Sequence, residues 1–401
     1  MDINKPETLV ITCAKGVVPY LKLELEQLGY DLKISSETSI EITASLYDAM
    51  RLNLLLHSAV SVLWLLKHFS CSDPDKLYKE ITSFPWENII LPTEYITIVS
   101  HVNTASINNS IFVNQRAKDA IVDRLFKIHN SRPNSGPAKD NIVINLYWKD
   151  DKCWLYLNTS GVKLSNRGYR KIPHTAPMQE TLAATLLSAA DYNGSQTFIN
   201  PMCGSGTLAI EAALIALKKA PGLLRDNFCL NHIKDFDSEI WEALREEVAS
   251  GEIKELPFKI IASDSDEKAI EAAKKNAIAA GVDSFIDFFI CSFNDTPIPE
   301  KGGIVILNPE YGHRLGEESE LENTYKEIGD FFKNKCSGST GYVFTGNLSL
   351  AKKIGFKASR RLIFFNARIE CRLLEYPMYI GSKQPKGEKE KEKREGEGKE
   401  E

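Results

Sequence analysis

Apolar residues follow two different spacings along the first part of the chain. Leu21, Leu25 and Leu28 lie three or four positions apart, which predicts a helix that Gly29 ends. Short apolar runs on either side of it predict strands. The order β-α-β-β-α-β is typical of a small ferredoxin-like layer, which we place at residues 1–67. Its expected elements are a strand at 9–13, a helix at 18–28, strands at 32–34 and 39–43, a helix at 46–55 and a strand at 58–66.

Residues 68–163 predict a second α/β unit. Its expected elements are helices at 75–83 and 111–129, a strand at 95–102, and a hairpin of strands at 141–148 and 153–157.

Residues 164–380 predict a larger α/β unit, in which strands and helices alternate. This alternation predicts a mostly parallel sheet with helices on both faces, and any ligand outside the carboxyl ends of the strands. Residues 381–401 mix Lys, Glu and Gly without an aromatic residue, so we expect a disordered tail. The expected elements are a helix at 176–190, strands at 197–199, 258–263, 285–290, 303–307, 341–344 and 362–365, and a last strand at 367–374 that pairs back antiparallel.

Composition narrows the class of protein. The chain has 401 residues, 43% of them hydrophobic, and a net charge of −5. No segment reaches the roughly 18 uninterrupted apolar residues of a membrane helix, and the first residues lack the order of a signal peptide. Eight cysteines are scattered without a C-x-x-C pair, which favours reduced thiols over disulfides or a zinc site. We therefore expect a cytoplasmic protein that binds neither a membrane nor a metal.

The segment 198–207 (FINPMCGSGT) combines a buried strand with a glycine turn. The apolar run breaks at Pro201, passes Gly204 and Gly206, and enters a helix at Thr207. The glycines allow the backbone to approach a ligand closely, and the helix N-terminus adds exposed N–H donors. This turn predicts a cofactor site.

The same turn also matches a dinucleotide-binding fingerprint, which requires a carboxylate about 20 residues further on. Here the next strand ends at Asp264, 60 residues after Gly204, so a nicotinamide cofactor is disfavoured. At a strand end, Asp264 can accept hydrogen bonds from both hydroxyls of a ribose. The alternative is a helix cap, and we expect Asp264 to bind the ligand and Asp266 to cap the helix at 267–280.

The segment 306–312 (ILNPEYG) is a second strand that ends in a turn. The side-chain oxygen of Asn308 and the carbonyl of Pro309 can accept the two hydrogens of an amino group on a planar base, while Tyr311 can stack on that base. A simple Asn-Pro turn is the alternative. Together, the two strand ends predict an S-adenosylmethionine-dependent methyltransferase that acts on a nucleic-acid amine.

Basic residues gather in the second region. Between residues 67 and 170 there are 14 Lys and Arg against 10 Asp and Glu, although the whole chain is acidic. Arg116 and Arg124 lie on the helix at 111–129, and Arg132 lies in the loop after it. They can bind an RNA backbone, or they can form the solvated face of an amphipathic helix. Arg167 and Arg170 flank Gly168, where they can hold a phosphate or belong to a surface loop.

Six ordered motifs resemble those of the THUMP-containing RlmL-like family, the bacterial 23S rRNA guanine-N2 methyltransferases, over nearly the whole chain apart from the tail. The motifs are 164–171 (LSNRGYRK), 176–184 (APMQETLAA), 200–207 (NPMCGSGT), 308–315 (NPEYGHRL), 345–347 (TGN) and 369–374 (IECRLL).

The resemblance implies a ferredoxin-like plus THUMP module that binds structured RNA, most directly 23S rRNA with tRNA as the other option, and a class I methyltransferase domain that binds S-adenosylmethionine. The implied catalytic residues are Asn308, Pro309 and Tyr311. The candidate RNA-binding residues, chosen from charge and position and not from the resemblance, are Arg116, Arg124, Arg132, Arg167 and Arg170. The resemblance maps the glycine turn of the cofactor site to Gly204 and Gly206 and the ribose-binding acid to Asp264. The predicted cofactor-binding set also includes their neighbours at the strand ends, Asn200, Met202, Thr207, Ser265 and Ser292.

The chain departs from the family pattern at three positions. Asn200 replaces the usual Asp, Cys291-Ser292 replaces an Asp at the end of the third strand, and Glu310 replaces a proline that would stiffen the loop. An RNA-binding ribosome-assembly protein with a degenerate methyltransferase domain is therefore the alternative to an active enzyme.

Overall fold

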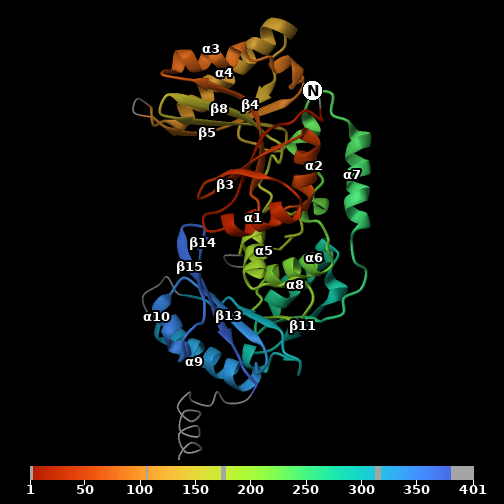
Figure 1. The fold of residues 1–401 in the computed structure, drawn as a ribbon, viewed down its shortest axis with the longest axis vertical. Helices are drawn as coiled ribbons and strands as arrows, with labels where there is room; N and C mark the ends of the chain where they lie inside the picture. Colours follow the sequence, from red (N-terminus) through yellow and green to blue (C-terminus); the bar gives the residue numbers. More distant parts are fainter. Residues whose placement is uncertain (1–2, 105–106, 173–177, 312–317, 381–401) are drawn as a thin grey trace, which may run out of the picture.

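Two β-sheets organise the computed structural model (Figure 1). It describes all residues except 1–2, 105–106, 173–177, 312–317 and 381–401. The expected disorder of the tail, the first residues of the helix predicted at 176–190, and part of the 308–315 motif fall outside the described residues.

The first sheet has eight strands in the order β2-β3-β1-β4-β8-β7-β5-β6. The predicted β-α-β-β-α-β order of the first region is confirmed, as is the hairpin of β7 and β8. The elements are β1 (Glu7–Thr12), α1 (Val18–Gln27), β2 (Leu32–Ser35), β3 (Ser39–Ala44), α2 (Leu46–Leu55), β4 (Ser61–Ser70), α3 (Pro74–Ser83), β5 (Tyr95–Asn103), α4 (Ser110–His129), β6 (Asn134–Ser135), β7 (Ile142–Lys149) and β8 (Lys152–Asn158).

Strand β4 begins three residues later than predicted and extends further. The backbone N–H groups of His57 and Ser58 donate to the carboxylate of Glu24 (2.5 and 3.2 Å), so these residues are held by α1 and not by the sheet. The strand then continues to Ser70, pairing with β1 in its first half and with β8 over most of its length. The first two predicted regions therefore share one sheet, and the boundary at 67/68 stays a prediction.

The second sheet has seven strands in the order β11-β10-β9-β12-β13-β15-β14. The pairs from β11 to β13 are parallel, and β15 runs antiparallel to both its neighbours, as predicted. The elements are α5 (Glu180–Ala189), β9 (Phe198–Pro201), α6 (Thr207–Ala216), α7 (Ser238–Ser250), β10 (Ile260–Asp264), α8 (Glu267–Ala280), β11 (Ile286–Ile290), β12 (Ile304–Leu307), α9 (Glu318–Lys335), β13 (Thr340–Thr345), α10 (Leu348–Ala351), β14 (Arg361–Asn366) and β15 (Ile369–Pro377).

Alternate residues of these strands enter two separate cores. Phe198, Ile260 and Ile306 pack with α5, α6 and α8, whereas Ile199 and Val305 pack with α9 and α10. The predicted sheet with helices on both faces is confirmed. The last strand begins at Ile369, not 367, because Ala367 adopts a left-handed φ of 54° in the tight turn that joins it to β14.

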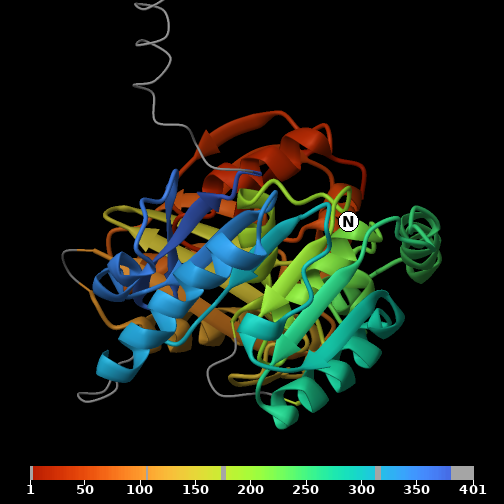
Figure 2. The same ribbon diagram turned by 90° about the horizontal axis from the view of Figure 1, so that it is seen from below.

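The long segment between α6 and β10 belongs to the core of the first sheet. Phe228, Leu230 and Trp241 are buried among side chains of the N-terminal strands and helices. The N–H of Val143 in β7 donates to the sulfur of Cys229 (3.2 Å). Helix α7 packs against α2 and runs along the outside of the molecule, seen from the side in Figure 1 and end-on in Figure 2. This segment therefore joins the second sheet to the N-terminal sheet.

Arg167 lies at the same junction and not at an RNA-binding surface. Its side chain is 1% exposed, so the predicted contact with RNA conflicts with its burial. The guanidinium donates to the carbonyls of Leu164 (2.8 Å) and His57 (2.5 Å), and pairs with Glu211 of α6 at 3.6 Å. Glu211 also accepts a hydrogen bond from the hydroxyl of Tyr169 (3.0 Å). These contacts join three parts of the molecule: the N-terminal module at His57, the chain between β8 and α5, and helix α6.

None of the helices in the described residues combines the length and the apolar character needed to cross a membrane.

We predict that Arg167→Met lowers the free energy of unfolding by about 3–5 kcal/mol, because it leaves the carboxylate of Glu211 buried without its cation. The double variant Arg167→Met/Glu211→Leu should recover most of this loss. Urea denaturation followed by circular dichroism measures both variants. A single variant at least as stable as the double variant would contradict the prediction.

The same experiment has a pH dependence. Burial raises the pKa of Glu211 to about 7 from an ordinary 4.5, although Arg167 acts to lower it. The raised pKa contributes to the free energy of unfolding. This contribution is fully present below pH 4.5 and is lost as the pH rises through 7. We expect this loss to be larger in Arg167→Met than in the wild type, and absent from the double variant.

Candidate cofactor and base site

The glycine turn after β9 has a strained backbone and one open side. Met202, Gly204 and Gly206 all have positive φ, at 56°, 55° and 83°. A Cβ at Gly206 would lie 2.9 Å from the Cβ of Ala273 on α8, so glycine is required there by close packing. A Cβ at Gly204 would meet nothing within 4 Å. Gly204 therefore presents backbone to open space, where a ligand can approach, and Thr207 begins α6 directly behind it.

Asp264 ends β10 beside this turn. One carboxylate oxygen accepts from the N–H of Gly204 (2.9 Å) and the other from the N–H of Asp266 (3.0 Å). Asp266 caps α8 by accepting from the N–H of Lys268 (2.9 Å), which confirms its predicted role as a cap. Ser265, between them, is exposed. The two acids thus have different positions: Asp264 bonds to the glycine turn, and Asp266 caps α8.

Asn200 connects the two strand ends that the sequence singled out. Its side chain is 1% exposed, and its Nδ2 donates to the carbonyl of Ile306 in β12 (2.9 Å). An Asp at this position would offer no N–H for that bond. Strands β9 and β12 pair in parallel, with Val305 opposite Ile199, so their carboxyl ends lie side by side. This is the point where the strand order reverses, the usual ligand-binding position in such sheets.

Asn308 follows β12 at this edge of the sheet. Its Oδ1 is buried and, within the described part of the chain, has no hydrogen-bond partner. Buried polar atoms are nearly always paired in folded proteins, and each one left unpaired costs about 1–3 kcal/mol. The Oδ1 of Asn200 is likewise buried without a hydrogen-bond partner among the described residues. Two acceptors are therefore left over at neighbouring strand ends, which is the arrangement expected where a ligand supplies the donors.

Tyr311 is held in place from β14. Asn366 donates from its Nδ2 to the hydroxyl oxygen of Tyr311 (2.9 Å), and burial raises the pKa of this tyrosine, which keeps the phenol neutral. A Cβ at Gly346 would lie 3.2 Å from the ring, so the ring packs on bare backbone. The hydroxyl of Tyr325 in α9 lies 3.4 Å from the carbonyl oxygen of Glu310. The loop 308–311 is thus supported from two neighbouring elements.

Ser292 lies just beyond the carboxyl end of β11. It is exposed, and its Oγ accepts from the N–H of Asn294 (3.4 Å). The N–H of Cys291 donates to the carbonyl of Asp264 (3.0 Å), which keeps this strand end next to that of β10. All the predicted cofactor residues are therefore located on the carboxyl ends of β9, β10 and β11, or directly after them.

Arg170 lies next to the glycine turn. It pairs with Glu180 of α5 (3.0 Å) and donates to the hydroxyl of Ser205 (3.3 Å). Sequence reasoning missed Asn276, which is fully buried in α8 and bonds to the backbone of Ile172 and of Ser205. The available signal was an amide among the small apolar residues on the inner face of a helix. Asn276 therefore holds the chain between β8 and α5 against the glycine turn.

The three arginines predicted to bind RNA in the second region differ in how much charge they present. Arg124 makes two short bonds to Glu87 (2.7 and 2.6 Å), which lower the pKa of that carboxyl. Arg116 pairs with Asp75 at 2.7 Å, and Arg132 pairs with Asp123 at 3.3 Å with its side chain 60% exposed. Arg132 is therefore the most accessible of the three, and RNA binding by them stays a prediction.

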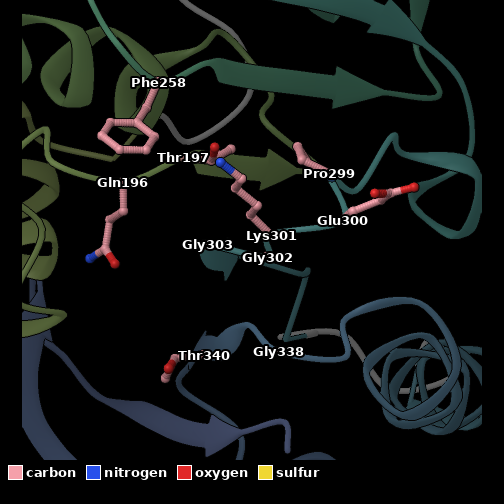
Figure 3. A pocket seen from close by; sticks show the side chains of 10 residues that line it. All are labelled: Gln196, Thr197, Phe258, Pro299, Glu300, Lys301, Gly302, Gly303, Gly338 and Thr340. Atoms are coloured by element: carbon pink, nitrogen blue, oxygen red, sulfur yellow. The ribbon is translucent and has the colours of Figure 1, made fainter. Parts of the chain in front are cut away.

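A pocket of ≈ 420 Å³ lies elsewhere on the second sheet (Figure 3). Its lining includes Thr197, Gly303 and Thr340, which lie at the amino ends of the central strands. The residues described above lie at the opposite ends of the same strands. This pocket is therefore separate from the candidate site.

Comparison with known families agrees with this architecture. Residues 8–63 match the RlmL ferredoxin-like domain, residues 71–158 the THUMP domain, and residues 167–375 the RMKL-like methyltransferase domain. The predicted fold class is thereby confirmed.

Individual relatives match along most of the chain. The ribosomal RNA large subunit methyltransferase K/L of Syntrophotalea carbinolica is 37% identical over 93% of this chain and 54% of its own length. A Synechocystis protein, provisionally named an RNA methyltransferase, is 32% identical over 92% of this chain and 96% of its own. The crystal structure of a possible methylase from Clostridium difficile 630 is 28% identical, with a TM-score of 0.84 over 95% of this chain and 100% of that one.

This chain spans about half the length of the K/L relatives and nearly all of the Synechocystis protein. It belongs to the RMKL-like methyltransferase family, with an RlmL ferredoxin-like domain and a THUMP domain ahead of the methyltransferase domain.

Proposed function

We propose that this chain transfers the methyl group of S-adenosylmethionine to the N2 amine of a guanine in 23S rRNA. The observation that carries the proposal is the Oδ1 of Asn308, which is buried and has no hydrogen-bond partner among the described residues. Asn308 follows β12, whose carboxyl end lies beside the strand that leads into the glycine turn. Family membership and the K/L relatives support the same activity.

The residues around the glycine turn fit S-adenosylmethionine, which supplies an electrophilic methyl group on a sulfonium sulfur. Gly204 leaves room for a ligand against its backbone. A carboxylate has about four acceptor positions, and Asp264 uses one on each oxygen for backbone N–H groups. The remaining positions can accept the two ribose hydroxyls. Asn200 Oδ1 provides a further buried acceptor, and Ser292 provides a hydroxyl at the third strand end.

Asn308 and Pro309 position the amine. The Oδ1 of Asn308 and the carbonyl of Pro309 accept its two hydrogens, and the nitrogen lone pair then points away from them, toward the cofactor side. Catalysis of this kind is mostly orientation and does not need a strong base. Tyr311, fixed by Asn366, offers a ring on which the base can stack. The base must leave its helical stack to reach this position.

Glu310 supports guanine as the target base. Its side chain is exposed on the loop, next to Pro309 and Tyr311. Guanine carries an N1–H donor beside its N2 amine, whereas adenine carries an N1 acceptor beside its N6 amine. A carboxylate can accept from guanine N1–H and repels the adenine acceptor. The residue that departs from the family pattern therefore favours guanine.

RNA as the substrate is supported by the THUMP domain and by the named activities of the relatives. A 23S substrate rests on the K/L relatives, and tRNA is the other structured RNA to be compared in the same assay.

Asn308→Ala should lower the rate of methyl transfer by about 100–1,000-fold, because a positioned polar group at the reacting amine is lost. The assay is transfer of labelled methyl groups to rRNA from cells that lack this protein. Asn193→Ala, in an exposed turn, is the matched control and should leave the rate unchanged. Wild-type rates in the Asn308 variant would remove the assignment.

Asp264→Asn should weaken binding of S-adenosylmethionine roughly tenfold or more, since a charged acceptor becomes a neutral one. Asp266→Asn is a close control, because Asn is as good a helix cap as Asp. Isothermal calorimetry with the cofactor compares the two variants. Equal affinities would contradict the role given to Asp264, and no binding by the wild type would favour an RNA-binding assembly protein.

Glu310→Gln should lower kcat/KM for guanine methylation about tenfold while leaving cofactor affinity unchanged, because the charged acceptor for N1–H is lost. Mass spectrometry of the modified nucleosides identifies the product. If the product were methyladenosine, or if the variant kept the full rate on guanine, Glu310 would not select the base.

A further inference from the structure

Four aromatic side chains form a row across four adjacent strands of the first sheet. His68 in β4 lies opposite Trp154 in β8, Trp154 lies opposite Tyr147 in β7, and Tyr147 lies opposite His101 in β5. Residues directly opposite one another in paired strands point to the same face of the sheet. The row therefore lies on one face and spans the THUMP part of the sheet.

The rings contact one another along the row. His68 and Trp154 stack with centroids 4.8 Å apart and planes 19° apart. His101 and Tyr147 stack at 5.4 Å and 2°. The central pair, Tyr147 and Trp154, is tilted by 50° at 5.7 Å. The row thus consists of two stacked pairs that meet at an open angle in the middle.

This face is the accessible one. The alternate residues of the same strands, among them Phe69, Trp148 and Cys153, are buried against the core. In contrast, His68, His101 and Tyr147 are exposed and Trp154 is half-buried. Figure 1 shows α3 and α4 on one side of β5 and β8. In the part of the chain that the structure describes, no hydrogen bond is made by the indole N–H of Trp154 or the hydroxyl of Tyr147.

A pair of like charges lies beside the row. Lys149 follows Tyr147 by two positions in β7, and it lies opposite Lys152 in β8. On either side of the two lysines lie Asn103 in β5 and Ser70 in β4. Like charges directly opposite in a sheet are destabilising. Among the described residues, neither lysine forms an ion pair, although Asp150 and Asp151 occupy the turn between them. An anion bound at this position would remove the repulsion.

We infer that this face binds an unpaired RNA segment, with bases stacked on the aromatic row and phosphates beside Lys149 and Lys152. Every base has a π face, so aromatic rings bind single strands with little sequence preference, and a neighbouring cation follows the backbone. The lysines lie about 6.8 Å along the strands from the rings, close enough to contact the phosphates of stacked nucleotides. This inference rests on the proposed function, because it names the part of the RNA substrate that the THUMP domain holds.

The test is titration of the full chain with a short oligouridylate, followed by tryptophan fluorescence and by anisotropy of a labelled oligonucleotide. Trp64, Trp86, Trp148 and Trp241 are all buried, so quenching on addition of the oligonucleotide reports mainly on Trp154. Trp154→Ala and Tyr147→Ala should each weaken binding roughly tenfold. Trp154→Phe should remove the quenching while keeping most of the affinity, since a stacking ring remains.

The lysines give an independent measurement. Log affinity falls as log salt rises, and Lys149→Ala/Lys152→Ala should make this fall shallower by about 1.4. The reason is that each phosphate contact in a single strand contributes about 0.7 to the slope. The controls are Phe289→Ala, an exposed ring on β11 of the other sheet, and Lys254→Ala, an exposed lysine; both should bind like the wild type.

Unchanged oligonucleotide affinity in Trp154→Ala and Tyr147→Ala, with melting curves like the wild type, would overturn the inference even if methyl transfer proceeds. Conversely, a wild type that binds through Trp154 but transfers no methyl group would reject the proposed function and support the RNA-binding face. Asn308→Ala should retain oligonucleotide binding, which separates the two sites.

Discussion

The candidate site depends on side chains that fasten neighbouring strand ends to one another. Asp264 bonds to the backbone of the glycine turn, and Asn200 bonds to the backbone of β12. A parallel sheet aligns the carboxyl ends of its strands but does not fix the turns that follow them. The two bonds fix the geometry between the end of β9 and its neighbours on both sides. The candidate cofactor and base residues can then be held in one arrangement before any ligand arrives.

This arrangement has a cost in stability. The Oδ1 atoms of Asn200 and Asn308 are buried without a partner in the described structure, and each such atom opposes folding by about 1–3 kcal/mol. The strained backbone at Met202 adds to this cost. The surrounding sheet offsets it, because the central strands are buried on both faces by two separate cores. Unfavourable local contacts at a site supported by a rigid scaffold are common where function needs pre-organised groups.

The junction between the two sheets is equally constrained. The segment between α6 and β10 contributes Phe228 and Trp241 to the N-terminal core, and the buried pair of Arg167 and Glu211 crosses the same boundary. A flexible linker would allow the N-terminal module to move relative to the candidate site. Extensive apolar burial together with a buried ion pair restricts that movement. An RNA held on the first sheet would therefore be presented to the second sheet in a limited range of orientations.

The sequence by itself determined the order of the elements and the local chemistry. Strand and helix periods, Gly204 and Gly206 at the turn, the cap at Asp266 and the Asn308 turn are properties of short segments, in which neighbouring residues decide the backbone. The tertiary structure alone decided the features that depend on residues far apart in the chain. Arg167 was expected at a surface and is buried, because its partner Glu211 lies on a different element. The aromatic row likewise appears only when four strands pair in register, since each strand supplies one ring and His68 and His101 come from strands outside the β7–β8 hairpin.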